Sequence, residues 1–359
     1  MLNFKVLQLK KLELQEGKQA MKVLVTGAAG FIGSHVVRAL LQEGHEVRAL
    51  HLPHDNLLNL RGLDVELFSG DVTDPDSMAK ACKGCQRVFH LAAIYALWLK
   101  DPSLMRKVNV YGTQVVLEAA RNQGVERVIH TSSIARFCGQ GLNRVANEES
   151  PFGLAITRNP YAISKAESHE VAVEAARKGQ DVVIVAPTGP VGPGDISPTP
   201  TGKLLLACAS MPVLTLPPTA SNMCDVRDIA RGQVLAAEKG KTGESYLLGH
   251  QDLTMKQLAE ITMEILGVSR PVVTVPFGLA EVAGKAALWL ADNVTHKAPL
   301  ITPDTVAISK LGLTADCTKA VKELGMPQTP IKTALQDAIS WFETHGYFEN
   351  NKRLQMLLG

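Results

Sequence analysis

A glycine-rich turn between a predicted strand and a predicted helix constrains the fold of this chain most strongly. Gly27, Gly30 and Gly33 come directly after the apolar run 22–25, and the stretch 31–42 that follows has helical spacing. Glycines at these three places allow a tight turn, a close approach to the backbone, and close packing of the helix on the strand. This turn predicts a strand–helix–strand unit of a parallel sheet.

The rest of the first half repeats the same alternation. Further strands are predicted at 46–50, 65–68, 87–91, 127–131 and 181–186, and helices at 108–122 and 163–178. Such alternation predicts an α/β fold with a doubly wound parallel sheet, covered by helices on both faces. We assign residues 21–190 to this part.

The chain changes character after Pro187. Prolines and glycines crowd 187–218, and longer helical patterns follow at 254–266 and 277–291. We expect 191–359 to form a smaller, mixed, substrate-binding part, with some segments returning to the main sheet. The apolar stretch 277–291 is compatible with core packing, with a lid over an apolar substrate, or with a shallow membrane contact.

The N-terminal residues 1–20 look like an extension that is not native. Met21 immediately precedes the first strong strand, and codons for residues 15–17 can spell a purine-rich ribosome-binding run. Charges interrupt the place where a signal peptide would have its apolar core. We therefore expect the natural chain to start at Met21.

Composition and charge exclude several classes of protein. The chain has 46% hydrophobic and 20% charged residues and a net charge of +2, without a basic or acidic block, so we expect no nucleic-acid partner. An apolar run of about 18 residues is absent, so no integral membrane segment is expected. The six scattered cysteines fit reduced thiols in a cytoplasmic protein, and the single C-x-x-C, Cys82 and Cys85, lacks a second metal-ligand pair. We expect no metal.

The glycine turn followed by a helix N-terminus favours a bound dinucleotide. The helix N-terminus carries partial positive charge, and the second glycine lets a pyrophosphate reach backbone N–H groups. An acidic residue at the end of the second strand would select NAD, and an arginine would select NADP. Neither lies at that point: Arg48 is inside the strand, and His51 and His54 are weak candidates. NADP and NAD both stay open.

A tyrosine and a lysine one helical turn apart are the candidate catalytic pair. Tyr161 and Lys165 face the same way on a helix, and a nearby ammonium lowers the pKa of a tyrosine. Tyr161 is then a candidate proton donor or acceptor near neutral pH. The hydroxyl residues 131–133 end a predicted strand, at the edge of the sheet where ligands of such folds bind.

Together these motifs resemble the extended short-chain dehydrogenase/reductase family, which includes NAD-dependent epimerases and dehydratases. The resemblance covers nearly everything after Met21. It is carried by Thr26–Gly33, Gly70–Val72, His90–Ala93, Val108–Thr113, Thr131–Ser133, Tyr161 with Lys165, and Asp225–Asp228. Within the family the chain looks most like the dihydroflavonol reductase-like branch, and there like the bacterial hopanoid-associated sugar epimerases, through Tyr95–Pro102 and Pro190–Gly202.

The resemblance implies a Rossmann-type fold and a role for each matching residue. Ser133 would bind the substrate oxygen, Tyr161 would exchange a proton with it, and Lys165 would hold the nicotinamide ribose. Asn109 would be a structural or a proton-relay residue. The cofactor-binding set would be Gly27, Ala29, Gly30, Phe31, Ile32, Gly33, His51, Asp71, Val72, Leu91, Ala92, Ala93, Asn109, Thr131, Tyr161, Lys165, Pro187 and Thr188.

The substrate is less well specified. Reductases of this branch often have an arginine where this chain has Leu52, and Arg136 and Asp225 also depart from the pattern. Arg136 could meet an anionic substrate group or form an ordinary surface ion pair. The candidate substrate residues are Tyr95, Trp98, Ser133 and Arg136. The scarcity of charged clusters in the variable part favours an apolar ketone or aldehyde over a nucleotide-sugar.

Three functions follow as hypotheses. The first is an NAD(P)-dependent oxidoreductase acting on a carbonyl or secondary alcohol of a small apolar substrate. The second is a sugar epimerase or dehydratase that retains its NAD. The third is a non-catalytic dinucleotide-binding regulator, against which the intact set of Ser133, Tyr161 and Lys165 argues. The partner expected is a small-molecule substrate, and the sequence leaves room for a homodimer.

Overall fold

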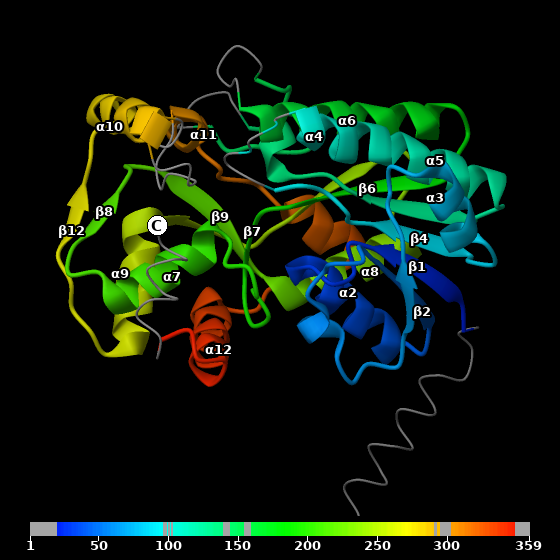
Figure 1. Cartoon of the computed structure of the whole chain (residues 1–359), viewed down its shortest axis with the longest axis horizontal. Helices are drawn as coiled ribbons and strands as arrows, with labels where there is room; N and C mark the ends of the chain where they lie inside the picture. Colours follow the sequence, from blue (N-terminus) through cyan, green and yellow to red (C-terminus); the bar gives the residue numbers. More distant parts are fainter. Residues whose placement is uncertain are drawn as a thin grey trace, which may run out of the picture.

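A seven-stranded parallel sheet organises the computed structural model (Figure 1). Its strand order is β10-β6-β5-β4-β1-β2-β3, and every neighbouring pair is parallel. The strands are β1 (Lys22–Thr26), β2 (Glu46–His51), β3 (Glu66–Ser69), β4 (Arg87–His90), β5 (Arg127–Thr131), β6 (Val182–Pro187) and β10 (Ser245–Leu248). The structure describes residues 20–95, 99, 101, 103–138, 144–153, 159–290, 293–294 and 303–348.

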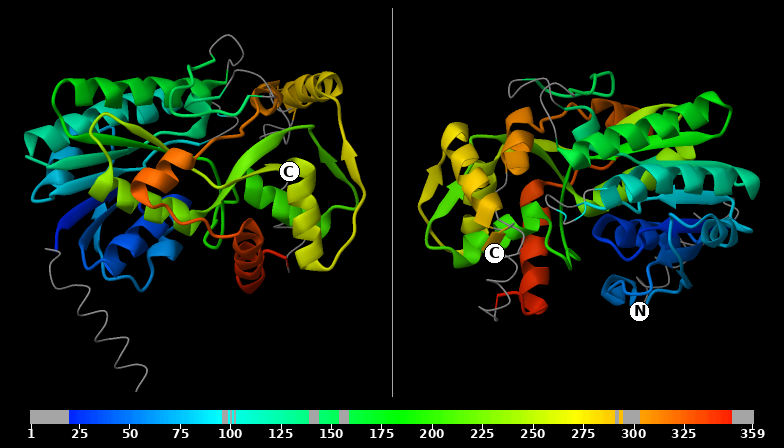
Figure 2. Two further views of the ribbon diagram at one scale, coloured as in Figure 1. Left: turned by 180° about the vertical axis from the view of Figure 1, so that it is seen from behind. Right: turned by 45° about the horizontal axis from the view of Figure 1, so that its top comes forward.

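Helices cover both faces of this sheet (Figures 1 and 2). One face carries α2 (Phe31–Gln42) and α8 (Val226–Lys239), and the other carries α3 (Pro75–Cys82), α5 (Gly112–Asn122) and α6 (Pro160–Arg177). Side chains alternate across β1: Val23 and Val25 join the core beneath α2, and Leu24 joins the core on the opposite face. The doubly wound, Rossmann-type fold expected from the sequence is therefore confirmed.

The helix that carries Tyr161 begins earlier than expected. We predicted a start at Ile163, but α6 begins at Pro160 because the side chain of Asn159 accepts a hydrogen bond from the backbone N–H of Ala162 at 3.0 Å. Proline at the first helical position needs no hydrogen-bond partner for its nitrogen. Tyr161 consequently lies in the first turn of α6, at the edge of the sheet.

The second lobe contains two small sheets and five helices among the described residues. One sheet has β7 (Gly189–Val191), β9 (Ala220–Asp225) and β11 (Gln251–Thr254), and the other has β8 (Leu214–Leu216) and β12 (Val272–Thr274). The helices are α7 (Pro200–Ser210), α9 (Met255–Leu266), α10 (Phe277–Leu290), α11 (Pro303–Leu311) and α12 (Ile331–Thr344). Between them in the chain, α8 packs on the main sheet and β10 joins it as an edge strand.

Five short helical segments complete the described elements. They are η1 (Leu57–Leu60), α4 (Ser103–Arg106), η2 (Lys107–Tyr111), η3 (Ile134–Arg136) and η5 (Ala320–Leu324). The segment η2 is a π-helical turn that runs directly into α5, so the helix expected at 108–122 changes its hydrogen-bonding pattern at Gly112.

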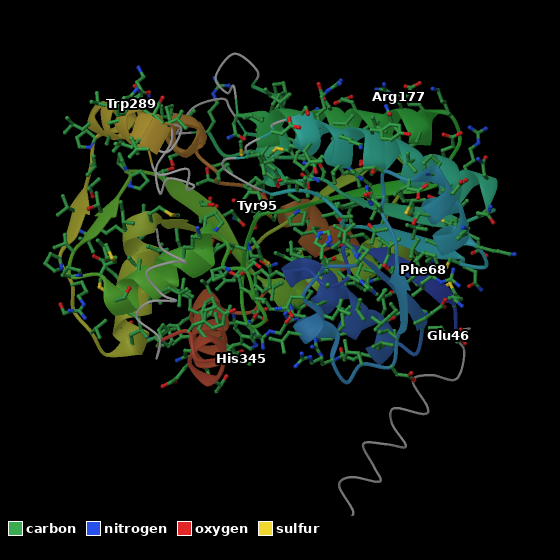
Figure 3. All side chains as sticks on the ribbon, in the orientation of Figure 1. Glu46, Phe68, Tyr95, Arg177, Trp289 and His345 are labelled. Carbon is green, nitrogen blue, oxygen red and sulfur yellow. The ribbon has the colours of Figure 1, made fainter. Side chains whose placement is uncertain are left out.

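The apolar helix α10 is not packed into the core. Leu279, Val282 and Trp289 are 61–67% exposed, although they recur at helical spacing and would suit a buried face. Figure 3 shows Trp289 on the outer side of this helix. Core packing of 277–291 is therefore wrong for these three side chains. None of the helices within the described ranges is long and apolar enough to cross a membrane.

Candidate active site

The glycine turn joins β1 to α2 at the carboxyl edge of the main sheet. Gly27 has φ +67°, and a Cβ there would lie 2.9 Å from the backbone nitrogen of Ala92. A Cβ on Gly33 would lie 2.1 Å from the carbonyl oxygen of Gly27, so only glycine allows the helix to approach the turn this closely. Ala29 and Gly30 complete the turn.

The N-terminus of α2 is free of competing side chains. Gly30 occupies the N-cap position without a side-chain cap, and the first helical turn, which starts with Phe31 and Ile32, has no acidic residue. Backbone N–H groups and the partial positive charge of the helix are therefore available to an anion. A side chain at Gly27 or Gly33 would fill the space of the glycine turn. With this space open and the N-terminus of α2 uncapped, the turn fits the pyrophosphate of a dinucleotide.

The loop after β4 forms the neighbouring wall of the site. The hydroxyl of Thr26 accepts hydrogen bonds from the backbone N–H groups of Leu91 (3.2 Å) and Ala92 (3.1 Å). Asn109 holds the same loop from the other side, since its side chain bonds both the N–H (2.7 Å) and the carbonyl (3.1 Å) of Ile94. Leu91 and Ala92 are partly buried, whereas Ala93 is exposed.

The side chain of Asn109 connects the 91–95 loop to α6. Besides its two bonds to Ile94, its amide donates to the hydroxyl of Ser164 at 2.9 Å, and the residue is 2% exposed. All the hydrogen-bonding groups of the side chain are thus engaged in tying the 91–95 loop to α6.

The turns after β2 and β3 lie at the same edge. His51 bonds the carbonyl of Leu52 at 2.8 Å, and Asp55 accepts from the backbone N–H of Leu52 at 2.8 Å. Asp71 is exposed and accepts from both the N–H and the hydroxyl of Thr73, while Val72 is buried beneath Gly112.

The side chain of Arg48 is hydrogen-bonded to the end of α3 and to β3. Its guanidinium donates to the carbonyls of Ala81 (2.6 Å) and Lys83 (2.9 Å) and to Glu66 (2.9 Å). It therefore closes the end of α3, and it does not serve as a selector for a 2′-phosphate.

The end of β5 and the first turns of α6 bring the proposed catalytic side chains together. Ser133 follows β5 at the N-cap of η3, and its hydroxyl lies close enough to the phenol of Tyr161, in the first turn of α6, to oppose the rise in the pKa of that phenol. Lys165 lies one turn further along α6, and its ammonium donates to the carbonyl of Thr131, the last residue of β5, at 2.7 Å. Residues that are 28 or more positions apart in the sequence thus meet at one strand end.

The electrostatics of the pair differ from the expectation. We expected the ammonium of Lys165 to lower the pKa of Tyr161, but burial raises that pKa, and the hydrogen bond from Ser133 opposes the rise only in part. The reason is desolvation, which disfavours the phenolate. The same burial lowers the pKa of Lys165 to about 8.

The candidate substrate residues separate into three cases. Tyr95 is 49% exposed and contacts Tyr161 edge to face, with ring centroids 4.7 Å apart. Figure 3 shows Tyr95 between the main sheet and the second lobe. Arg136 instead donates to Glu170 and to the carbonyl of Ser150, both at 3.2 Å. The contact with Glu170 is an ion pair, which was the second of the two roles considered for Arg136. Trp98 lies outside the described residues.

A loop of the second lobe is hydrogen-bonded to α2 and η1, next to the glycine turn. His35 of α2 bonds the carbonyl of Pro193 at 2.8 Å, and Asn59 donates to the carbonyl of Gly194 at 2.9 Å. The adjacent Asp195 lines a small pocket with Phe31, and burial raises the pKa of Asp195 to about 6. Pro187 ends β6, and the hydroxyl of Thr188 donates to the carbonyl of Leu248 at 3.3 Å.

Buried histidines lie beneath the site, and two of them, His130 and His169, escaped the sequence prediction. His90, His130 and His169 are each at most 4% exposed, and the charge of Lys165 acts on all three. The available signal was a histidine directly after the apolar pair Val128 and Ile129 in a predicted strand. Within the described ranges no group of His, Cys, Asp and Glu side chains is arranged to hold a metal ion.

Comparisons with known proteins agree with this geometry. The family model described as "NAD dependent epimerase/dehydratase family" matches residues 23–249. A protein of Synechocystis named "Putative dihydroflavonol 4-reductase" is 38% identical over 90% of this chain and 95% of its own length. "Sterol demethylase protein B" of Methylococcus capsulatus is 34% identical over 91% and 99%, respectively.

A solved structure shows the same fold. It is DesIV, a dTDP-glucose 4,6-dehydratase from Streptomyces venezuelae with NAD and TYD bound, and it superposes with a TM-score of 0.74 at 27% identity. The match covers 91% of this chain and 98% of that chain.

Proposed function

Since the chain belongs to the NAD dependent epimerase/dehydratase family and is an NAD(P)-dependent oxidoreductase, we propose that it exchanges hydride with a small apolar carbonyl compound or secondary alcohol. In this proposal the dinucleotide binds and leaves in each catalytic cycle. The observation that carries the proposal is the meeting of Ser133, Tyr161 and Lys165 at one strand end, where the ammonium of Lys165 donates to the carbonyl of Thr131.

Each of these side chains has one task in the proposed reaction. A nicotinamide dinucleotide, when bound, supplies or accepts the hydride. Tyr161 donates its phenolic proton to the substrate oxygen during reduction and takes it back during oxidation. Ser133 binds the same oxygen and orients it towards the phenol, and Lys165 holds positive charge where the phenolate forms.

The nucleotide is proposed to lie along the carboxyl edge of the sheet. The turn of Gly27, Gly30 and Gly33 would hold the pyrophosphate, the loop 91–93 would line the cleft, and Lys165 would hold the ribose next to the nicotinamide. His51, Asp71 and Val72 would lie on the adenosine side. NAD and NADP are both carried forward as candidates.

Two features support an apolar substrate. The exposed ring of Tyr95 contacts the ring of Tyr161 and offers an apolar surface next to the proposed proton donor. Arg136 is paired with Glu170, so it presents no unpaired charge to the diphosphate of a nucleotide-sugar. Relatives named as a dihydroflavonol 4-reductase and a sterol demethylase protein point the same way.

A second candidate is an epimerase or dehydratase that oxidises and reduces the same substrate. It is favoured by the family model and by the solved dehydratase that contains NAD. The two candidates differ in how long the dinucleotide stays bound, because only the second reaction regenerates its cofactor within each turnover.

The nucleotide carried through purification tests the proposal. The purified full chain is denatured, and the released nucleotide is identified and quantified by mass spectrometry. Little or no nucleotide supports an exchanging reductase. Near-stoichiometric NAD contradicts it and moves the cofactor-retaining reaction to first place. The identity of any nucleotide, together with titrations with NADH and NADPH, selects between the two cofactors.

Turnover is then measured with a panel of apolar carbonyl compounds. The panel contains dihydroquercetin, a 3-ketosteroid, a 3-oxo fatty acid and cinnamaldehyde, with NADH and with NADPH. Tyr161→Phe should lower the turnover number by roughly 10²-fold or more and leave dinucleotide affinity unchanged, because only the proton donor is lost. Tyr95→Phe, which keeps the neighbouring ring, is the control. Turnover that survives in Tyr161→Phe would refute the assigned chemistry.

A further inference from the structure

The helix α10 of the second lobe buries little of its own surface. Of its 14 residues only Ala280 and Gly284 are buried, and these lie one turn apart, so they form one narrow line along the helix. The main neighbour of α10 among the described elements is α11. The helix is therefore packed along one side and open along the other.

The open side of α10 carries an apolar stripe, formed by Leu279, Val282, Ala286 and Trp289. These residues recur at helical spacing and are all exposed, Leu279 to 65%, Val282 to 67% and Trp289 to 61%. Figure 3 shows Trp289 on the outer side of the helix. A helix that is apolar on both sides is normally enclosed, and an exposed apolar patch of this kind marks an interaction surface.

The charges of α10 add a second feature to this surface. The helix has two charged residues, Glu281 and Lys285. Lys310 of α11 pairs with Glu281 and lies 5.9 Å from the ring centre of Phe277, so the negative charge is compensated. Lys285 is exposed and has no ion-pair partner among the described residues. It lies one turn from Trp289, at the edge of the apolar stripe, and leaves this surface with one uncompensated positive charge.

These features fit a lipid surface better than a second copy of the chain. A stable protein interface buries roughly 800 Å² on each partner. One side of a helix about 21 Å long offers much less than that area. A bilayer surface has no such requirement, because each apolar side chain that enters it contributes separately. Tryptophan favours the depth of the lipid headgroups, and a flanking lysine favours anionic ones.

We propose that α10 docks on the surface of a bilayer that contains anionic lipids, with the apolar stripe inserted between headgroups and Lys285 at the level of the phosphates. The helix would lie in the plane of the surface, since none of the described helices is long and apolar enough to cross a membrane. This inference goes beyond the proposed reaction and does not depend on it. A bilayer is also where an apolar substrate of the kind proposed above concentrates.

Sedimentation of the full chain with vesicles tests the proposal. The vesicles are made of phosphatidylcholine alone or of phosphatidylcholine mixed with phosphatidylglycerol. The double variant Leu279→Ser/Trp289→Ser removes the apolar contact, and Lys285→Gln removes the charge. Leu67→Ser is the matched control, because Leu67 is 52% exposed in β3. Figure 3 shows Phe68, the next residue of β3, at the opposite end of the molecule from Trp289.

The two kinds of variant should affect binding differently. The wild type should bind reversibly, and more tightly to the anionic vesicles. The double variant should lower the partition coefficient by roughly 10-fold or more for both vesicles, because the inserted side chains are lost. Lys285→Gln should lower it by roughly 5-fold for the anionic vesicles only. Absence of binding by the wild type, or equal losses in the double variant and in Leu67→Ser, overturns the proposal.

Fluorescence of Trp289 identifies what covers the stripe. The chain has three tryptophans, so the difference between the wild type and Trp289→Phe isolates the signal of Trp289. Acrylamide should quench this signal in solution, and bound vesicles should shield it from acrylamide while brominated lipids quench it. A signal that is shielded before vesicles are added would assign the stripe to another segment of this chain or to a second copy, and would overturn the proposal. Neither measurement uses a substrate, so both outcomes stand whatever reaction the protein catalyses.

Discussion

Lys165 carries a charge where the surroundings disfavour one. The residue is 4% exposed, and burial lowers its pKa to about 8, from an ordinary value of 10.5. Its ammonium has one hydrogen bond, to the carbonyl of Thr131. Such a buried charge costs stability, so its presence at this place is better explained by chemistry than by folding.

The sign of this effect gives a stability prediction that depends on pH. Between pH 8 and pH 10.5 the unfolded chain binds a proton at Lys165 and the folded chain does not, so the contribution of this residue to stability rises with pH in that window. At pH 7 Lys165 is charged in both states, so the folded protein bears the full free-energy cost of burying the ammonium. Lys165→Met should therefore raise the free energy of unfolding by roughly 3 kcal/mol at pH 7, and by much less at pH 10.

Urea denaturation of both proteins at the two pH values measures this difference. Lys178→Met is the control, because Lys178 is exposed at the end of the same helix and pairs only with Glu174, so its replacement should change the free energy of unfolding by less than about 0.5 kcal/mol. A loss of stability in Lys165→Met at pH 7 would contradict the prediction.

The glycine turn is the element on which the proposed nucleotide site depends. Gly27 requires its positive φ, and Gly33 requires the absence of a side chain, because α2 passes directly over the turn. The requirement at Gly33 is a contact between two segments of backbone, which cannot move aside as a flexible side chain can.

Gly33→Ala should displace the start of α2. Its Cβ would lie 2.1 Å from the carbonyl oxygen of Gly27, so we expect a loss of at least about 3 kcal/mol in stability and of dinucleotide binding. Gly124→Ala is the control: Gly124 has φ +70° with open space around it, so only the backbone strain of about 1–2 kcal/mol is expected. Equal losses in the two variants, measured by urea denaturation and NADH titration, would disprove the steric argument.

At the scale of the whole molecule, polar contacts join the lobes around the site. The loop of Pro193 and Gly194 is bonded to α2 and η1. Arg227 in α8 pairs with Asp225, which is 0% exposed, and with Asp337 of α12. These contacts hold the second lobe next to the glycine turn and α2 (Figure 1).

Arg227 provides the test of this connection. Arg227→Met leaves the buried carboxylate of Asp225 without its cation, and should lower the free energy of unfolding by about 2 kcal/mol, a value reduced for the partial exposure of Arg227. The double variant Asp225→Asn/Arg227→Met should recover most of the loss. Asp337→Asn, which removes only a half-exposed partner, should cost less than about 1 kcal/mol. No loss in Arg227→Met would mean that the pair does not stabilise the molecule.

Local periodicity was sufficient to predict the main sheet. The strands at 22–25 and 127–131 and the helix at 31–42 were predicted within one residue, because buried parallel strands and amphipathic helices have distinct patterns. The start of α6 was missed because the capping bond of Asn159 competes with the apolar pattern that begins later. The exposure of Trp289 was missed because an apolar helical pattern does not indicate whether another part of the protein covers the apolar face of the helix.

The sequence by itself determined the parallel sheet, the glycine turn and the pairing of Tyr161 with Lys165, because spacing along one strand or one helix specifies these features. Only the tertiary structure decided the electrostatics. The pKa of Tyr161 depends on its burial. The hydrogen bonds of Arg48 and Arg136 are made to partners that are distant in sequence. The same holds for His130, which is buried beside His90 and has no hydrogen-bond partner for either ring nitrogen among the described residues.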